Sequence, residues 1–334
     1  MRAAMVLSVL LVAAILAGCG GDEASGPLTI YSGREEELVA PLFEQFTEET
    51  GIEVEVRYGD SAELAATIAE EGSNSPADVF FAQDPGSLGA VDPQLEELPE
   101  DILERVDERY RDAESRWVGT SGRTRVLVYS TEAVDESALP DSVLDLTRPE
   151  WADRVGIAPT NASFQAFVTG MRLELGDDET RAWLEGLKKN GAKTYEKNTP
   201  IVEAVAAGEI DVGLVNHYYL ALVKEEQPDA PIANHLFAAG DVGNLVSVAG
   251  AGLLSSTDQL SDAEAFVEFL LSDVGQRFYV DEAEEAEYPL VAAVAPPPGL
   301  VPLDEIEGPD VELTSFGAEL EATVELLRET GWLS

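Results

Sequence analysis

Residues 28 to 82 alternate between strand and helix patterns, and this alternation constrains the fold more than any other feature of the chain. The segment "LTIY" (28–31) is a short apolar run, "GIEVEVRYG" (51–59) alternates with a period of two, and "ADVFFA" (77–82) is apolar throughout. Such runs are typical of strands, and a fully apolar one is typical of a parallel strand buried on both faces. Between them, the apolar positions that share one helical face are Leu38, Val39, Leu42, Phe43 and Phe46, then Leu64, Ala65 and Ile68. The order strand, helix, strand, helix, strand predicts an open parallel sheet covered by helices, which is an α/β fold.

The rest of the chain continues this mixture. Further strands are expected at 123–130, 154–159, 209–215 and 244–254. Further helices are expected at 164–175 and 178–189, as one long amphipathic helix over 262–280, and at about 315–330.

The charge balance excludes several classes of partner. The 334 residues contain 65 Asp and Glu against 20 Lys and Arg, a net charge of −45 at pH 7. A field of this sign repels nucleic acid and anionic lipid, so we expect no nucleic-acid binding. Because the acids are spread along the whole chain, adaptation to a salty or acidic habitat explains the bulk charge best. With one cysteine and two histidines, a disulfide within the chain, a cysteine cluster and a zinc site of several histidines are excluded.

The first 18 residues read as a signal peptide. Arg2 precedes an apolar run from Ala3 to Ala17, which is shorter than the ~20 residues that span a bilayer. The end of this run, "LAGC" (16–19), resembles the bacterial lipobox, in which cleavage precedes a cysteine that is then lipidated. We therefore expect a mature chain anchored through lipidated Cys19 to the outer face of the cytoplasmic membrane, with residues 19–26 as a flexible tether.

Three segments follow predicted strands and are candidates for one binding site. They are "YSGREEE" (31–37), "YGDSAE" (58–63) and "NHYYL" (216–220). Ligands of open parallel sheets bind beyond the carboxyl ends of the strands. Two adjacent tyrosines point to opposite faces in a strand, but at a strand-to-helix turn both phenol oxygens can face one cleft. Tyrosinate oxygens suit a hard cation such as Fe³⁺, whereas ordinary packing at a helix start is the alternative for Tyr218 and Tyr219.

The chain resembles the bacterial ferric-iron-binding proteins of ABC importers, which are two-domain periplasmic binding proteins. The matching stretches run in order from residue 28 to about 295 and include "LTIYSGR", "SPADVFFAQD", "SGRTRVLVYS", "GEIDVGLVNHYYL" and "AEYPLVAAV". The resemblance implies two α/β lobes, each a parallel-rich sheet flanked by helices, joined by two crossing strands near 123–130 and 245–254. The implied lobe 1 is 27–124 with 247–300, and lobe 2 is 125–246 with 301–334.

The resemblance also implies a metal site. Tyr218 and Tyr219 match the family's two tyrosinate ligands. Glu35 stands where many members have a histidine ligand, and Glu63 lies one residue beyond a position that holds a glutamate ligand in some members. The alternatives are a solvated acid for Glu35 and, for Glu63, helix capping with Asp60. His217 is expected to pack or face solvent.

A synergistic anion, phosphate or carbonate, is implied as well. The positions that match anion-binding residues are Asn161, Ala162, Ser163, Asn198 and Asn216, with Arg123 matching an anion-associated arginine of other members. Turn and cap roles compete with this for the asparagines, and pairing with an acid competes for Arg123.

The function implied is capture of Fe³⁺ by a monomeric lipoprotein that delivers it to an ABC permease and its ATPase. The alternative within the same fold is a receptor for a polyamine, thiamine, a phosphonate or a sugar. An enzyme is not indicated, because the sequence has no G-x-S-x-G, P-loop, histidine-rich metal motif or reactive cysteine.

Overall fold

The computed structural model of the protein describes residues 26–282, 286–297 and 300–334. The predicted signal peptide, Cys19 and most of the predicted tether lie outside the described residues. In the part of the chain that is described, no helix combines the length and apolarity needed to cross a bilayer.

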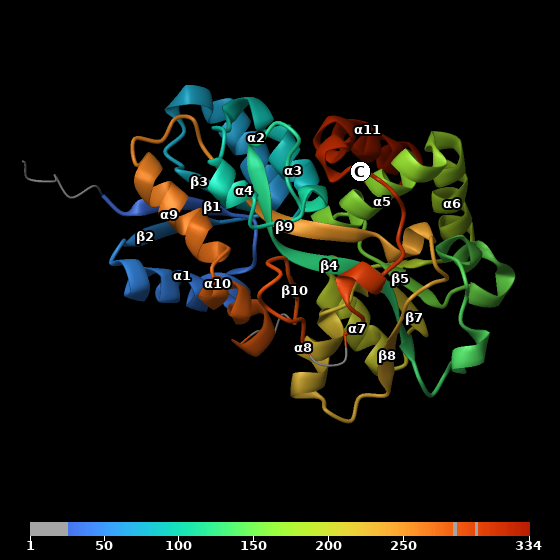
Figure 1. The fold of residues 1–334 in the computed structure, drawn as a ribbon. Coiled ribbons are helices and arrows are strands. Elements are labelled where there is room, and N and C mark those ends of the chain that lie inside the picture. Colours follow the sequence, from blue (N-terminus) through green and yellow to red (C-terminus); the bar gives the residue numbers. More distant parts are fainter. Residues whose placement is uncertain (1–25, 283–285, 298–299) are drawn as a thin grey trace, which may run out of the picture.

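A mixed sheet of ten strands forms the frame of the molecule (Figure 1). Its order is β2 (Val54–Tyr58), β1 (Leu28–Ser32), β3 (Val79–Ala82), β9 (Val246–Leu253), β4 (Trp117–Ser130), β7 (Val212–Asn216), β5 (Val155–Ile157) and β6 (Lys193–Thr194), with β8 (Ile232–His235) and β10 (Tyr288–Pro289) also paired to β4. The neighbours β2–β1–β3 are parallel, as predicted from residues 28–82, and β7–β5–β6 are parallel as well. The strands β4 and β9 run antiparallel to each other and to their other neighbours, β7 and β3.

The strand β4 belongs to both ends of this sheet. It pairs with β9 as far as Thr124 and with β7 from Arg125 onward. Figure 1 shows β4 and β9 running between two groups of elements, which we call the first lobe (containing β1–β3) and the second lobe (containing β5–β8). The α/β fold with two crossing strands is confirmed; the lobe ranges given above stay a prediction.

The helices flank the strands. They are α1 (Glu36–Thr50), α2 (Ser61–Glu71), α3 (Pro85–Ala90), α4 (Glu100–Leu103), α5 (Ala162–Leu175), α6 (Asp177–Lys189), α7 (Asn198–Ala206), α8 (Tyr219–Glu226), α9 (Leu260–Leu270), α10 (Asp273–Arg277) and α11 (Phe316–Glu329). The helix α1 buries the predicted apolar face and ends at Gly51, whose φ of 76° is in the left-handed region that glycine adopts at low cost. Asp60 caps α2 by accepting a hydrogen bond from the Ala62 amide at 2.9 Å.

The single long helix predicted over 262–280 is wrong. The chain breaks after α9 at Leu271, and the Ser272 hydroxyl caps the separate helix α10 by accepting from the Gly275 amide at 3.1 Å. Gly275 lies so close to the end of α9 that an added Cβ would meet the Phe269 carbonyl oxygen at 2.2 Å. The apolar periodicity continues across the break, which is why the pattern alone did not predict it.

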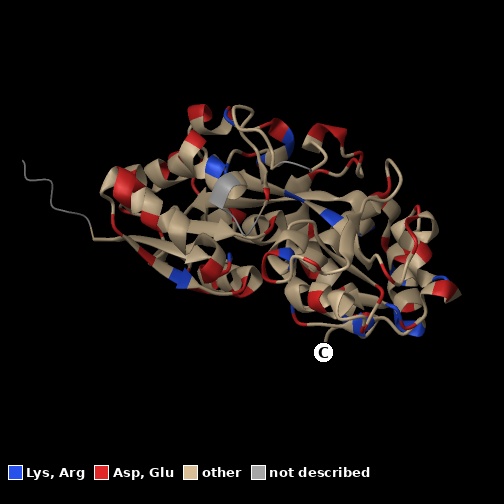
Figure 2. Cartoon of the chain, turned by 90° about the horizontal axis from the view of Figure 1, so that it is seen from below, with Lys and Arg blue, Asp and Glu red and all other residues tan. Residues whose placement is uncertain are grey.

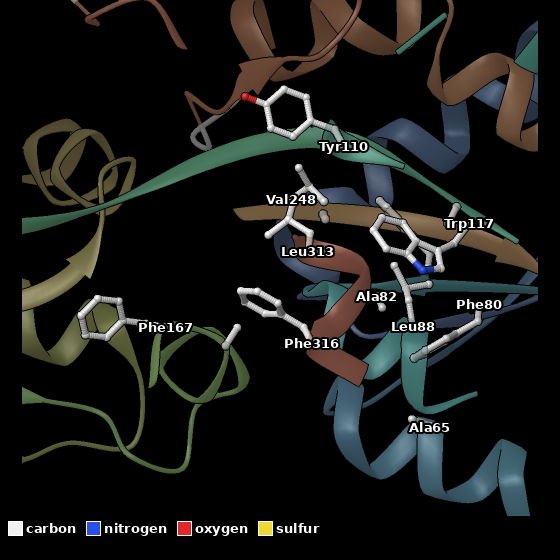
Figure 3. Packing of buried hydrophobic residues seen from close by; sticks show 14 of the residues in the cluster. Ala65, Phe80, Ala82, Leu88, Tyr110, Trp117, Phe167, Val248, Leu313 and Phe316 are labelled. Carbon is white, nitrogen blue, oxygen red and sulfur yellow. The ribbon is translucent and has the colours of Figure 1, made fainter. Parts of the chain in front are cut away.

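The last helix, α11, packs against both α3 and α5. Figure 3 shows its first residue, Phe316, between Phe167 of α5 and Leu88 of α3. The contact with α3 is made backbone to backbone, since a Cβ added to Gly317 would meet the Gly89 Cα at 2.4 Å. The helix α11 therefore bridges α3 and α5, which follow strands of the first and the second lobe.

The acidic residues cover the exterior. Figure 2 shows Asp and Glu on helices and loops over the whole of the face seen from below, with fewer Lys and Arg among them. This distribution reflects the spread of the acids along the whole chain.

Candidate functional site

The tyrosine pair lies at the turn between β7 and α8, at the boundary between the lobes. The strand ends at Asn216 and the helix begins at Tyr219, so the alternation of a strand no longer separates the two side chains. Their rings are 4.4 Å apart between centroids, and the exposed fractions are 1% for Tyr218 and 2% for Tyr219. The two hydroxyl groups hydrogen-bond to each other. The turn thus brings two phenol oxygens to one buried point.

Burial favours the protonated form of Tyr219 in the absence of a cation. It raises the pKa of Tyr219 well above the usual 10, and the neighbouring Tyr218 and Glu35 add to the increase. A hydrogen bond from Asn198 acts in the opposite direction. A metal that binds here must therefore displace protons.

Four predicted polar residues converge beside the tyrosines. Asn161 caps α5, and its Oδ1 accepts from the Ser163 amide at 3.0 Å and the Ser163 hydroxyl at 2.5 Å. Asn198, the first residue of α7, donates from Nδ2 toward Asn161 Oδ1 at 3.4 Å. Asn216 donates from Nδ2 to the Tyr218 hydroxyl at 3.4 Å. Ala162 is the buried first residue of α5, so the N-termini of α5 and α7 meet here, and a helix N-terminus is a favourable place for an anion.

Arg125 completes this cluster, and the sequence interpretation missed it. Its acceptors are Ser163 Oγ at 3.3 Å, Asn216 Oδ1 at 3.0 Å and the Leu214 carbonyl at 3.0 Å. Its guanidinium carbon lies 5.5 Å and 5.6 Å from the ring centroids of Phe164 and Phe167. Burial lowers the pKa of Arg125 to about 9, although the nearby phenols of Tyr219 and Tyr218 oppose this. The signal was available, since Arg125 is two residues from Arg123 on the same predicted strand.

Arg123 itself lies in a different cluster. Its Nε is 3.6 Å from Glu287 Oε1, and the same carboxylate lies 3.2 Å from Arg34 Nη1 and accepts from Ser121 Oγ. Both Arg123 and Glu287 are buried. Burial alone raises the pKa of Glu287, but the Arg34 and Arg123 guanidiniums outweigh it and hold that pKa below its usual value. The alternative predicted for Arg123, pairing with an acid, is therefore the arrangement observed.

The two predicted acidic ligands have different positions. Glu35 precedes α1 in the first lobe, and its Oε1 lies 3.0 Å from Nζ of Lys197, which precedes α7 in the second lobe. From the first lobe, Glu35 is near enough to Tyr219 to raise the pKa of its phenol. Glu63 is an exposed residue in the first turn of α2, and no hydrogen bond or ion pair of its side chain occurs among the described residues.

His217 packs, as expected, rather than facing the tyrosine oxygens. Its Nδ1 accepts from the Thr124 amide at 3.3 Å, and its Nε2 lies 2.9 Å from the Ala286 carbonyl oxygen, to which it donates. Its ring lies 4.7 Å from that of Tyr288. Burial lowers the pKa of His217 to about 4. Both ring nitrogens are used, which leaves none for a metal.

The described residues offer no conventional metal cluster. Nowhere in 26–282, 286–297 or 300–334 do three His, Cys, Asp or Glu side chains gather closely enough to hold an ion. Two phenols and one carboxylate would instead make an all-oxygen donor set, which suits a hard cation.

The chain is similar to known proteins over nearly its whole length. The model of the family of bacterial extracellular solute-binding proteins matches residues 65–300. The Fe(3+)-binding periplasmic protein of Serratia marcescens is 33% identical over 330 residues, which is 97% of this chain and 96% of that protein. The major ferric iron-binding protein of Neisseria meningitidis serogroup B is 36% identical, over 96% of this chain and 97% of that protein. The crystal structure of iron-bound HitA from Pseudomonas aeruginosa superposes with a TM-score of 0.87 at 34% identity, covering 91% of this chain and 99% of HitA.

Proposed function

This chain belongs to the bacterial extracellular solute-binding proteins, and we propose that it captures ferric iron between its lobes through the phenol oxygens of Tyr218 and Tyr219. Membership of this family makes it a transport component rather than an enzyme, acting outside the cytoplasm. Relatives that share its length and carry ferric iron in their names support the choice of cargo.

The observation that carries the proposal is the geometry of the tyrosine pair. Two phenol oxygens lie together at one buried turn, with rings 4.4 Å apart, and Asn216 donates a hydrogen bond to one of them. Fe³⁺ prefers anionic oxygen ligands, and a trivalent charge favours the ionised phenols. Other hard cations would also bind oxygen donors. Coordination by two tyrosinates is the property that distinguishes Fe³⁺ from them.

The other ligands of the metal are proposed from where their side chains lie relative to the tyrosine pair. Glu35 is the candidate third protein ligand, because its carboxylate approaches the pair from the other lobe while holding Lys197. Glu63 is a candidate only if its exposed helix end turns toward the metal. A synergistic phosphate or carbonate would be held at the start of α5 by Asn161, Ala162 and Ser163, with Asn198 and Asn216 beside it. Arg123 would act on that anion only after exchanging its partner Glu287.

Delivery completes the proposed function. The protein hands iron to an ABC permease driven by its ATPase, as a monomer held at the membrane by lipidated Cys19. Cleavage before Cys19 removes residues 1–18. The lobes, 27–124 with 247–300 and 125–246 with 301–334, open to exchange the cargo, since the buried tyrosines offer iron no direct path from solvent.

The test is the visible absorption spectrum of the mature protein, produced without Cys19, after addition of ferric citrate. Tyrosinate bound to Fe³⁺ gives a red to purple charge-transfer band, which Tyr218→Phe and Tyr219→Phe should each weaken. Tyr195→Phe, which changes a half-buried tyrosine of the same lobe, serves as the control and should leave the band unchanged. Absence of a band in the unaltered protein at stoichiometric iron would overturn the proposal in favour of another small ligand.

A further inference from the structure

Arg125 determines which atoms donate and which accept in the hydrogen bonds beside the tyrosines. A guanidinium has only donors, so every neighbour that bonds to it must present an acceptor. Arg125 is 2% exposed, and its Nη atoms donate to Ser163, Asn216 and the Leu214 carbonyl. Water therefore does not compete for these neighbours in the structure.

Asn216 shows the consequence most directly. Its Oδ1 faces Arg125 at 3.0 Å, so its Nδ2 is the atom that faces the Tyr218 hydroxyl at 3.4 Å. An amide turned by 180° would place two donors against each other at Arg125. The orientation is thus imposed by the arginine, and Tyr218 receives a donor.

The second branch follows the same rule. Arg125 donates to Ser163 Oγ, and the Ser163 hydroxyl in turn donates a hydrogen bond to Asn161 Oδ1. With Asn161 Oδ1 and Ser163 Oγ both acting as acceptors, Asn198 meets them with its Nδ2, at 3.4 Å and 3.5 Å. Asn198 also hydrogen-bonds to Tyr219 in the sense that favours the ionised phenol. Both phenol oxygens therefore lie against donors.

We propose that Arg125 is the positioning residue that orients the amides of Asn216 and Asn198, so that each turns its Nδ2 donor rather than its oxygen toward the phenols of Tyr218 and Tyr219. Donors at these oxygens favour the ionised phenols, and they act against the hydrogen bond between the two hydroxyls, which favours protonated Tyr219. This inference rests on the proposed function for its use, but the orientation of the amides exists without iron.

The charge of Arg125 agrees with this role. Among the residues that the structure describes, no carboxylate lies within ion-pair distance of its guanidinium, in contrast to the Arg123–Glu287 pair. A buried cation without a carboxylate is costly unless another anion approaches it. Ionised phenols of the loaded site supply negative charge at that place.

The first experiment uses the metal-free protein and NMR of its side-chain amides. In the unaltered protein, the Nδ2 protons of Asn216 should show cross-relaxation to the ring of Tyr218. In Arg125→Gln this contact should weaken, because the amide is no longer held in one orientation. An Asn216 amide with its oxygen toward Tyr218 in the unaltered protein would refute the inference, whatever the protein does with iron.

The second experiment follows the ferric charge-transfer band in Asn216→Asp, Asn216→Leu and Arg125→Lys. Loss of the donor raises the energy of the phenolate electrons, so the band of both Asn216 variants should move to longer wavelength. The pH at which half the band is lost should rise by about one unit, since a donor favours the charged oxygen over its protonated form. Arg125→Lys keeps a donor toward the Asn216 oxygen, so its band position and pH dependence should change less than those of the Asn216 variants.

The matched control is Arg154→Gln, which removes another arginine of the second lobe, one that pairs with Asp211 instead. It should leave band position and pH dependence unchanged. If Arg125→Gln does not fold, the two Asn216 variants test the same step. Variants that bind iron with an unshifted band and pH profile would overturn the inference while leaving the tyrosine ligands intact; loss of the band in the unaltered protein would overturn the proposed function.

Discussion

Replacing Lys197 with glutamine should speed iron release, because Lys197 and Glu35 form an ion pair that connects the two lobes. The two charged atoms are 3.0 Å apart and belong to the residues that precede α7 and α1. Because the partners of the pair lie in different lobes, a motion that moves the lobes apart would separate them. The pair therefore stabilises the closed state against the open one through which the cargo leaves.

The exposure of the pair decides the magnitude. Two unit charges at about 4 Å attract by ~1 kcal/mol in water and by ~4 kcal/mol at an effective dielectric of 20. The side chains of Lys197 and Glu35 are 59% and 36% exposed, so the attraction between them is closer to the value in water than to the value at a dielectric of 20. Measured pairs of this kind contribute about 0.2–1 kcal/mol, which corresponds to release that is roughly 1.4 to 5 times faster in the variant.

The assay is stopped-flow transfer of Fe³⁺ to excess chelator at low and high salt. At about 1 M salt the screening length is ~3 Å, so the difference between the variant and the unaltered protein should vanish. Lys193→Gln is the control, since Lys193 bonds the Glu209 carbonyl within the second lobe. Slower release from Lys197→Gln would refute the reasoning, because it would mean that Lys197 competes with the metal for Glu35.

Two further predictions concern stability. Glu287→Gln leaves the guanidiniums of Arg34 and Arg123 without this buried carboxylate and should destabilise the fold by about 3–5 kcal/mol in urea unfolding; no loss of stability would show that solvent already screens the pair. His217 has a folded pKa of about 4 against 6.5 when exposed, so the unfolded chain binds more protons between these values and stability should fall by about 3 kcal/mol as pH decreases through that window. The free energy of unfolding of His217→Gln should differ less between pH 7 and pH 4.5 than that of the unaltered protein. An equal difference in both proteins would contradict the lowered pKa of His217.

The sequence predicted elements whose patterns are local. The strands β1, β2 and β3 follow from apolar runs, and the tyrosine pair was placed correctly at a strand end because β7 is continuous and apolar. The strand β6 was missed because it is two exposed residues, Lys193 and Thr194, that are recognised as a strand through their pairing with β5.

The parts of the site that escaped prediction depend on contacts across the molecule. Arg123 and Arg125 look equivalent in the sequence, and their difference arises because β4 changes partner between Thr124 and Arg125. The pairing of Lys197 with Glu35 joins residues 162 positions apart and exists only through the approach of the lobes. Neither periodicity nor motif spacing carries that information.

The position of α11 has a consequence for how the protein is made. The chain builds most of the first lobe, crosses to the second, returns through β9 and then ends in a helix that covers α3 and α5 together. Contacts of such high sequence separation form late and fold slowly. Until residues 316–329 dock, the faces of α3 and α5 that receive Phe316 remain uncovered. The packing of both helices is therefore completed only by a segment that follows nearly all of the rest of the chain in sequence.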